Sequence, residues 1–388
     1  MLTRLRVRNF KCLQDVDVPL EPLTALIGPN DSGKTSILQA LNLLGILAAH
    51  DQVLGAAPRP FTVPPAEVPD GYRLDQLIWR RDRGRSFEWE VEGELESLPF
   101  RYQLTVSPTN LLSTSRAEVA GQLTAEQGAA LRQALTVSNP YFLLPEALKR
   151  GAPPAPDPVL SPSGDNLAAV LDALITGYDR ETALGLERSI RENIPTLRGL
   201  SLRTLPASSP ARLSDKEKLL AFFQNLVSVA EPQLGDGRGP VKVIDFVLAG
   251  SERPPVVIPA AQASDGALLI TAFLALAYGD SPPILLIEEP ENGFHPSRLQ
   301  AVLELLRRIT RGEVGPRPRQ IILTSHSPIL LNFLRPEEVR IVHRDPTEGT
   351  KVTPLTQAPR IDELLKEFGI GELWYHLREE GLLRGDAP

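Results

Sequence analysis

The chain has 388 residues, of which 42% are hydrophobic and 23% charged, a composition typical of a soluble globular protein with two lobes. Its 48 acidic and 41 basic residues give a net charge of -7, which argues against a protein that binds polyanions over its whole surface. The single cysteine, Cys12, excludes a disulfide framework and a cysteine zinc site. The longest apolar stretch, residues 267–278, is shorter than the roughly 20 residues that cross a bilayer. With no signal-peptide pattern, we expect a cytoplasmic protein without membrane contact.

The first hundred residues predict strands around one helix. Residues 1–9 alternate between apolar and basic side chains, as in a half-buried strand. A second strand, residues 23–27, precedes a glycine-containing loop, and residues 36–48 have helical spacing. From residue 73 to 106 the period is two, which predicts antiparallel hairpins.

The loop after the second strand fits the pattern G-x-x-x-x-G-K-[ST] at every fixed position. Gly28 and Gly33 allow successive N–H groups to turn toward a polyphosphate, and the next helix directs its positive end to the same anion. Lys34 is expected to span the β- and γ-phosphates, and Thr35 to offer its hydroxyl to Mg²⁺. The residues expected to bind the nucleotide here are Pro29, Asn30, Asp31, Ser32, Gly33, Lys34, Thr35 and Ser36.

The middle of the chain reads as mainly helical. Residues 124–135 predict a helix that begins with a capping box of Thr124 and Gln127. The proline-rich residues 151–158 predict a loop, residues 166–193 a helical pair, and residues 215–230 one more helix. Strand patterns return at the positions 241–248 and 256–258.

The last third alternates between strands and helices. Helical spacing covers residues 268–276 and 297–310, and short apolar strands cover residues 284–287 and 320–324. Such alternation predicts a mostly parallel sheet covered on both faces. Ser264, Asp265 and Gly266 open the first of these helices, where Ser264 suits an N-cap. The same three residues also suit a second anion site at the helix start, and the pattern alone leaves both interpretations open.

Two acids follow the strand at residues 284–287. Parallel strands present ligand groups at their carboxyl ends, where the phosphate loop also lies. Glu288 is expected to hold Mg²⁺ through water, and Glu289 to orient or deprotonate the attacking water. His326 follows the next strand and is expected to lie one strand from the acids, near the γ-phosphate.

The order of these motifs resembles the RecF- and OLD-like branch of ABC/SMC-type ATPases. The resemblance also includes residues 9–13 (Asn-Phe-Lys-Cys-Leu), residues 294–296 (Phe-His-Pro) and residues 371–374 (Gly-Glu-Leu-Trp). It implies a P-loop ATPase that binds ATP and Mg²⁺ and closes as a head-to-head homodimer around two nucleotides. In that class Ser264, Asp265 and Gly266 form a signature loop that reaches the γ-phosphate of ATP on the opposite subunit, and residues 291–295 line the dimer contact.

The implied fold class is α/β, a P-loop ABC/SMC-like head with a mixed, mostly parallel sheet, an antiparallel β subdomain and a helical insertion lobe. We expect the first head lobe at residues 1–110, the insertion at 111–239, the second head lobe at 240–345 and a helical tail at 346–388. The 62 residues after His326 are too few for the Toprim nuclease domain of OLD enzymes, and the middle segment is too short for SMC arms. A separately encoded effector or nuclease is therefore an expected partner.

Two arginine clusters are candidate DNA contacts, although solvated charge beside nearby acids is the interpretation that the sequence favours. The clusters are Arg80, Arg81, Arg83 and Arg85, and Arg307, Arg308, Arg311, Arg317 and Arg319. The main hypothesis is an ATPase that works on DNA, in repair or phage defence, or on a partner effector. The alternatives are a nucleotide-gated binding module with little turnover and, less consistent with the signature loop, a transporter ATPase subunit.

Overall fold

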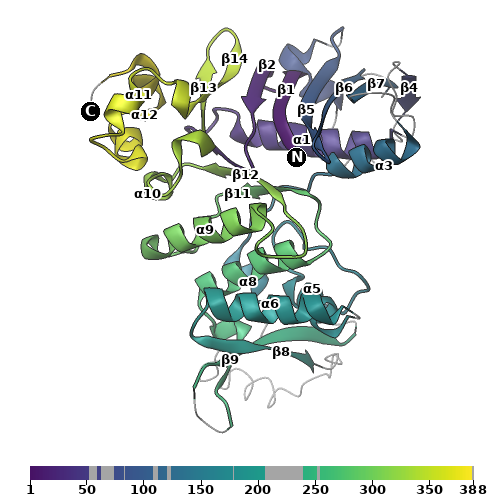
Figure 1. Ribbon diagram of the computed structural model, residues 1–388, viewed down its shortest axis with the longest axis vertical. Coiled ribbons are helices and arrows are strands. Elements are labelled where there is room, and N and C mark those ends of the chain that lie inside the picture. The colour runs from purple at the N-terminus through teal and green to yellow at the C-terminus, as the bar shows by residue number, and fades with distance from the viewer. Residues whose placement is uncertain are drawn as a thin grey trace, which may run out of the picture. The chain divides into compact units, whose positions relative to one another are not determined.

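The computed structural model describes residues 1–51, 59–62, 74–82, 84–107, 112–119, 124–177, 179–205, 239–250 and 254–386. The chain forms two compact units (Figure 1). Unit 1 comprises Met1–Pro140, Pro282–Glu291 and Arg319–Pro388, and unit 2 comprises Tyr141–Ser281 and Asn292–Pro318. Both units are therefore assembled from segments that are distant in the sequence.

Unit 1 is built on one mixed sheet, which has eleven strands among the described residues in the order β11-β12-β3-β13-β14-β2-β1-β5-β6-β7-β4. In chain order the strands are β1 (Leu2–Phe10), β2 (Leu13–Pro19), β3 (Leu23–Ile27), β4 (Arg59–Thr62), β5 (Phe87–Leu95), β6 (Leu98–Val106), β7 (Leu112–Val119), β11 (Ile284–Glu288), β12 (Gln320–Ser325), β13 (Val339–Asp345) and β14 (Gly349–Pro354).

The parallel part of this sheet consists of β11, β12, β3 and β13. Its register pairs Glu288 with Thr324, and Ser325 with Ile27. These three strands therefore end at the same edge of the sheet, which is where ligands bind in open α/β sheets. β11, β12 and β3 are almost wholly buried, which explains why they read in the sequence as short apolar runs and not as alternating ones.

The rest of the sheet pairs antiparallel, from β13 through β14, β2, β1, β5 and β6 to β7 and β4. The helix α1 (Lys34–Ala49) packs against β1, and α3 (Ala125–Ala134) against α1 and β5 (Figure 1). Phe10, Phe87 and Trp89 form an aromatic cluster in this core, with ring centroids 5.8–6.1 Å apart. The Trp89 indole N–H donates to the Ala40 carbonyl at 3.1 Å, which joins the sheet to the middle of α1.

The remaining helices of unit 1 are short, apart from the last. They are α2 (Leu74–Leu77), the 3₁₀ helix η2 (Trp79–Arg81), α10 (Pro328–Leu331), η5 (Pro336–Glu338), η6 (Leu355–Gln357), α11 (Ile361–Leu364) and α12 (Ile370–Arg384). The helix α12 packs on α10 and β13, and Leu373 and Trp374 are buried. The chain's end is thus a strap on unit 1.

Unit 2 has a layered arrangement of its own. The antiparallel strands β8 (Leu197–Leu205), β9 (Val241–Leu248) and β10 (Val257–Pro259) form a small sheet covered by α5 (Leu167–Thr176) and α6 (Arg180–Asn193). These helices contact α8 (Asp265–Tyr278), which contacts α9 (Leu299–Thr310) (Figure 1). Unit 2 also contains α4 (Pro145–Leu148), η3 (Ala260–Gln262) and η4 (Pro296–Arg298). No helix in the described ranges is long and apolar enough to span a membrane.

The structure confirms several sequence expectations and corrects others. β3 and β9 have the predicted bounds, and both bonds of the Thr124–Gln127 capping box form at α3. Six strands were not predicted, namely β2, β4, β7, β8, β13 and β14. β7 and β8 lie in the stretch expected to be helical, and β14 lies in the expected helical tail. The helix expected at residues 215–230 lies outside the described residues.

Candidate nucleotide-binding site

The phosphate loop connects β3 to α1 and packs against the hairpin of β13 and β14. A Cβ on Gly28 would lie 2.2 Å from the Val342 carbonyl oxygen, and one on Gly33 would lie 2.2 Å from Thr350 Oγ1. Gly33 also has a φ of 111°. Thr350 donates its hydroxyl to the Ser32 carbonyl at 2.8 Å and so fixes the loop from behind. Only glycine fits at these two positions.

A hollow of about 620 Å³ lies in front of this loop, within unit 1. That volume is in the range of small-molecule and cofactor sites. The hollow is lined by Cys12, Asn30, Asp31, Gly33, Lys34, Thr35, Ser36, Glu288, Glu289, Thr324 and Arg344. The structure therefore brings together most of the predicted phosphate-loop residues and both predicted acids.

Lys34 lies over the loop that it terminates. Its ammonium donates to the carbonyl oxygens of Gly28 at 2.7 Å and Pro29 at 2.8 Å. Burial lowers the pKa of Lys34, while the charges of Glu289, Asp31 and Glu288 oppose this shift. The ammonium thus lies among weak carbonyl acceptors, which the charged oxygens of a phosphate can replace.

Thr35 and Glu288 face each other across the hollow. The Thr35 hydroxyl donates to Glu288 Oε2 at 3.5 Å. Burial raises the pKa of Glu288, and the Glu289 charge adds to this, whereas the Thr35 bond and Lys34 act in the opposite direction. Hydroxyl and carboxylate oxygens are ligands that suit Mg²⁺, which usually keeps several waters and takes the rest from substrate phosphates. Among the described residues there is no group of three or more His, Cys, Asp and Glu side chains that could hold a metal. That Thr35 and Glu288 hold Mg²⁺ stays a prediction.

Glu289 and His326 meet at the ends of neighbouring strands. His326 Nδ1 lies 2.9 Å from Glu289 Oε1, and the two side chains are 53% and 29% exposed. The Glu289 backbone N–H donates to the Thr324 carbonyl at 3.0 Å, and Glu289 has a φ of 47°. For a residue other than glycine this angle is uncommon, and such strain concentrates at functional sites. The histidine thus contacts the acid expected to act on water.

The predicted signature loop lies in unit 2. The Ser264 hydroxyl accepts from the Ala267 N–H at 3.3 Å, which confirms the N-cap interpretation. Asp265 forms an ion pair with Lys149 at 3.1 Å, and Gly266 lies against the Phe294 ring. A hollow of about 390 Å³ lies at this helix start, and His295 and Arg298 are part of its lining. The interpretation as an anion site stays a prediction.

The arginine clusters have acidic partners. In unit 2, Arg307 and Arg311 pair with Glu304, Arg308 with Glu192, and Arg317 with Asp280. Arg319 is fully buried, so the expectation that it contacts DNA is wrong, because a side chain in the core of unit 1 is not accessible to a duplex.

The other cluster is only partly described. Arg85 pairs with Asp82 at 3.1 Å, and Arg80 donates to the Thr347 carbonyl at 3.2 Å. Arg81 has a φ of 56°, and Arg83 lies outside the described residues. Arg80 and Arg85 are therefore engaged within unit 1.

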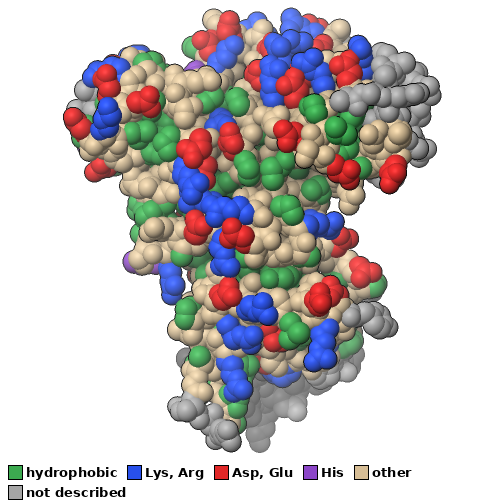
Figure 2. Space-filling view, in the orientation of Figure 1, with side chains coloured by type: hydrophobic (Ala, Val, Ile, Leu, Met, Phe, Trp, Pro, Cys, Tyr) green, Lys and Arg blue, Asp and Glu red, His purple; other side chains and the backbone are tan. Residues whose placement is uncertain are grey.

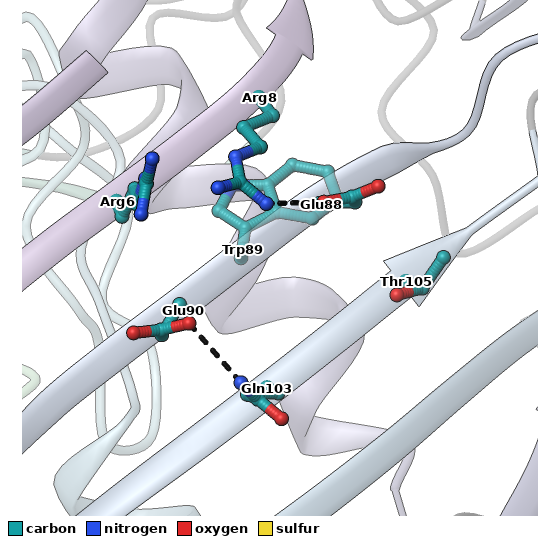
Figure 3. Close-up of a pocket in the computed structure, with 7 residues that line it drawn as sticks. All are labelled: Arg6, Arg8, Glu88, Trp89, Glu90, Gln103 and Thr105. Carbon is teal, nitrogen blue, oxygen red and sulfur yellow. Dashed lines mark hydrogen bonds and ion pairs between the residues drawn. The ribbon is translucent and has the colours of Figure 1, made fainter. Parts of the chain in front are cut away.

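A second hollow of unit 1, of about 310 Å³, lies on the open face of β1, β5 and β6. Figure 3 shows Arg8 directed at Glu88, and Glu90 at Gln103, with distances of 3.1 Å in both cases. Arg6 forms a bidentate pair with Asp15 at 2.8 Å. The charges around this hollow are thus matched by neighbouring strands.

Sequence reasoning missed several residues of the nucleotide site. Arg344 lines the hollow from β13, and Val342 and Thr350 support the glycines of the loop. These three residues belong to the unpredicted hairpin of β13 and β14, so no motif pointed to them. Cys12 lies in the segment that carried the family resemblance, and its thiol donates to the Ser36 hydroxyl at 3.3 Å.

Two regions of the chain match families of ATPases. Residues 168–332 match the family described as "AAA domain, putative AbiEii toxin, Type IV TA system", and residues 1–50 match the family described as "AAA ATPase domain". The chain is 25% identical over 418 residues to the OLD nuclease of Thermus scotoductus (strain ATCC 700910 / SA-01). This alignment covers 98% of the chain and 70% of that protein.

Other similarities are shorter or more distant. A stretch of 46 residues is 48% identical to the DNA replication and repair protein RecF of Proteus mirabilis (strain HI4320), which covers 12% of the chain and 13% of RecF. The SMC head domain from Thermotoga maritima superposes with a TM-score of 0.44 at 14% identity, covering 91% of this chain and 98% of that one. For the recombination mediator protein RecF with ATPrS the TM-score is 0.39 at 13% identity, with coverages of 84% and 92%.

The phosphate loop, the paired acids at the sheet edge and the matches to two ATPase families point to one class of protein. Together they support a P-loop ATPase that is similar to OLD nuclease and RecF.

Proposed function

We propose that the protein binds ATP with Mg²⁺ and hydrolyses it. The observation that carries this proposal is the contact of His326 with Glu289 at 2.9 Å, at the edge of the hollow that Lys34 and Thr35 line. A phosphate loop alone would support nucleotide binding. An oriented acid beside it supports turnover as well.

The chain's own groups account for binding. The N–H groups of the loop and the start of α1 surround the β- and γ-phosphates, and Lys34 leaves the carbonyls of Gly28 and Pro29 for phosphate oxygens. Thr35 and Glu288 hold Mg²⁺, which neutralises charge on the phosphates when it is bound.

Glu289 is the proposed general base. Its carboxylate accepts a proton from the attacking water while the water oxygen bonds to the γ-phosphorus and the bond to the β–γ bridging oxygen breaks. His326 holds one oxygen of this carboxylate at 2.9 Å, so the other oxygen is directed to the water. ADP and phosphate then leave.

Assembly and coupling are further parts of the proposal. In a head-to-head homodimer, Ser264, Asp265 and Gly266 at the start of α8 contact the γ-phosphate of ATP bound to the second copy. The opening and closing of this dimer does work on DNA or on a separately encoded effector or nuclease. The names of the relatives, a nuclease and a DNA replication and repair protein, support a DNA-related role.

Replacing the base tests the assignment. We expect Glu289→Gln to bind ATP, to lose about 100-fold or more in kcat, and to accumulate as an ATP-bound dimer, because general-base catalysis contributes about 10²–10⁴-fold. Phosphate release and light scattering with ATP and either Mg²⁺ or EDTA measure both effects. Glu337→Gln, at an exposed glutamate of unit 1, is the control and should behave as wild type.

Undiminished hydrolysis by Glu289→Gln would rule out the base. Negligible hydrolysis by the wild-type protein, with and without DNA, would favour the nucleotide-gated binding module instead. Repeating the measurement with DNA in rising salt tests the coupling, since contacts with the phosphate backbone weaken as salt increases.

A further inference from the structure

Glu291 and Ser325 form a buried pair behind the proposed catalytic residues. Glu291 follows β11 and is 9% exposed, and Ser325 ends β12 and is fully buried. The Ser325 hydroxyl donates to Glu291 Oε1 at 2.5 Å, a short bond of the charge-assisted kind. Neither residue lines the hollow in front of the phosphate loop.

This pair is hydrogen-bonded to the backbone next to His326. Ser325 immediately precedes the histidine, and its hydroxyl oxygen accepts from the N–H of Ser327, which immediately follows it, at 3.0 Å. Ser327 in turn caps α10 through the Leu330 N–H at 3.4 Å. The histidine therefore lies on a short turn whose two ends are tied to one hydroxyl, and that hydroxyl is tied to Glu291.

The bond between Ser325 and Glu291 also joins the ends of β11 and β12. A backbone bond from the Glu289 N–H to the Thr324 carbonyl at 3.0 Å joins them as well. Together these bonds hold the residue after each strand, so that His326 Nδ1 and Glu289 Oε1 meet at 2.9 Å. Because both side chains are partly exposed, this contact depends on how well the turn beneath it is held.

Placing a carboxylate here costs stability. Burial raises the pKa of Glu291, and the nearby Glu289 charge raises it further, while the Ser325 bond opposes both. Burying a charge is unfavourable unless it is well paired, and apolar residues of similar volume usually serve stability as well or better. A glutamate at this position is therefore better explained by the turn it holds than by a contribution to the core.

We propose that Glu291 is a positioning residue, which acts through Ser325 to hold the His326 turn and thereby the orientation of the Glu289 carboxylate. This inference rests on the proposed function, since it assigns Glu291 a role in the same hydrolysis. Glu291 does not line the nucleotide hollow. It acts through His326.

A double-mutant cycle on the full chain tests this role. We expect Glu291→Ala and Ser325→Ala each to lower kcat for ATP hydrolysis about 10- to 100-fold with little change in KM, because misplacement by about 1 Å can cost 10²-fold. Glu291→Gln retains an oxygen that accepts from Ser325 and should lie much closer to wild type. In a His326→Ala background, Glu291→Ala should cause no further loss, since residues that act as a unit are not additive.

Glu338 supplies the matched control for general effects of removing a buried glutamate. It is 6% exposed, and its Oε2 accepts from the Arg335 N–H at 2.8 Å, at a position that does not line the hollow. Glu338→Ala should lower the melting temperature without lowering kcat. If Glu338→Ala loses as much kcat as Glu291→Ala, the loss in Glu291→Ala reflects impaired folding, and the positioning role is wrong.

The outcomes separate this inference from the proposed function. If Glu289→Gln is inactive but Glu291→Ala and Ser325→Ala turn over ATP like wild type, the positioning role is wrong and the ATPase assignment stands. An equal loss from Glu291→Ala in the wild-type and His326→Ala backgrounds would likewise overturn action through the histidine. If Glu289→Gln hydrolyses ATP normally, the proposed base is wrong, and the positioning role fails with it.

Discussion

Two hollows of unit 1 contain similar residue types but are built differently. The one before the phosphate loop has Lys34, Glu288 and Glu289 in its lining, and the one on β1, β5 and β6 has Arg6, Arg8 and Glu88. The second belongs to a charged ladder, which consists of Arg4, Arg6, Arg8, Asp15, Asp17, Glu88, Glu90, Glu92 and Arg101. Figure 2 shows basic and acidic side chains interleaved over this part of the surface.

The difference lies in the partners of the charged groups. In the ladder, each arginine faces a carboxylate on a neighbouring strand at 2.6–3.3 Å, as in the pair of Arg4 and Asp17. In the nucleotide hollow, Lys34 is bonded to neutral carbonyls, and Glu288 is bonded to a hydroxyl at 3.5 Å. Charged side chains that already pair with opposite charges gain little from binding a ligand. Charged side chains bonded only to neutral groups can exchange these partners for phosphate oxygens or a metal ion.

The largest contrast is expected from removing one cation of each hollow. Lys34→Ala should weaken ATP binding about 10- to 100-fold, since a hydrogen bond to a charged group contributes about 1.5–3 kcal/mol. Arg6→Ala should leave ATP binding unchanged and lower stability slightly, because exposed ion pairs contribute about 0–1 kcal/mol. Calorimetric titration with ATP and a thermal melt measure the two effects. A large loss of ATP affinity in Arg6→Ala would break the distinction between the hollows.

A smaller contrast is expected in the pH dependence of stability. Arg6 lowers the pKa of Asp15, so the stability that this pair provides is present above pH 3.8 and lost as the pH falls through the folded-state value. Burial raises the pKa of Glu291, so its ionisation is unfavourable in the folded protein, and stability is lost as the pH rises from 4.5 through the folded-state value.

Melting temperatures between pH 2 and 8 test these opposite signs. Asp15→Asn should be less stable than wild type at pH 7, and its deficit should shrink as the pH falls. Glu291→Gln should be more stable than wild type at pH 7, and its advantage should shrink toward pH 4.5. If Glu291→Gln is less stable than wild type at pH 7, the ionised Glu291 carboxylate is stabilised by its hydrogen bonds, and the expected cost of its burial is wrong.

The smallest effect concerns Asp31, which lies in the phosphate loop with a φ of 65°. The sequence places an aspartate where glycine is frequent in this loop, and a left-handed backbone angle accounts for that preference. Asp31→Gly should tighten ATP binding about two- to fivefold, because it removes both the strain and a carboxylate beside the phosphates. Asp31→Asn removes only the charge, so the comparison of the two variants in the same titration separates the two causes. Unchanged affinity in both would show that Asp31 turns away from the phosphates.

Local patterns predicted much of the nucleotide site. The phosphate loop, the acids after β11 and the histidine after β12 each follow an apolar strand, and parallel pairing brings such strand ends to one edge. The hairpin of β13 and β14 was missed. β13 is buried over most of its length and so shows no alternation, and β14 pairs with β2 through a single register position, Gly349 with Leu13. The residues that support the loop from behind were missed with it.

The sequence by itself determined the chemistry of the site, because spacing within a strand-loop-helix unit dictates which groups face a phosphate. Only the tertiary structure decided which of these groups contact one another. The contact of His326 with Glu289, the tie of Glu291 to Ser325, and the pairing of the arginines with acids all join residues through strand register or through helices packed together. Such contacts have no local pattern, since they depend on where distant segments lie once the core is buried.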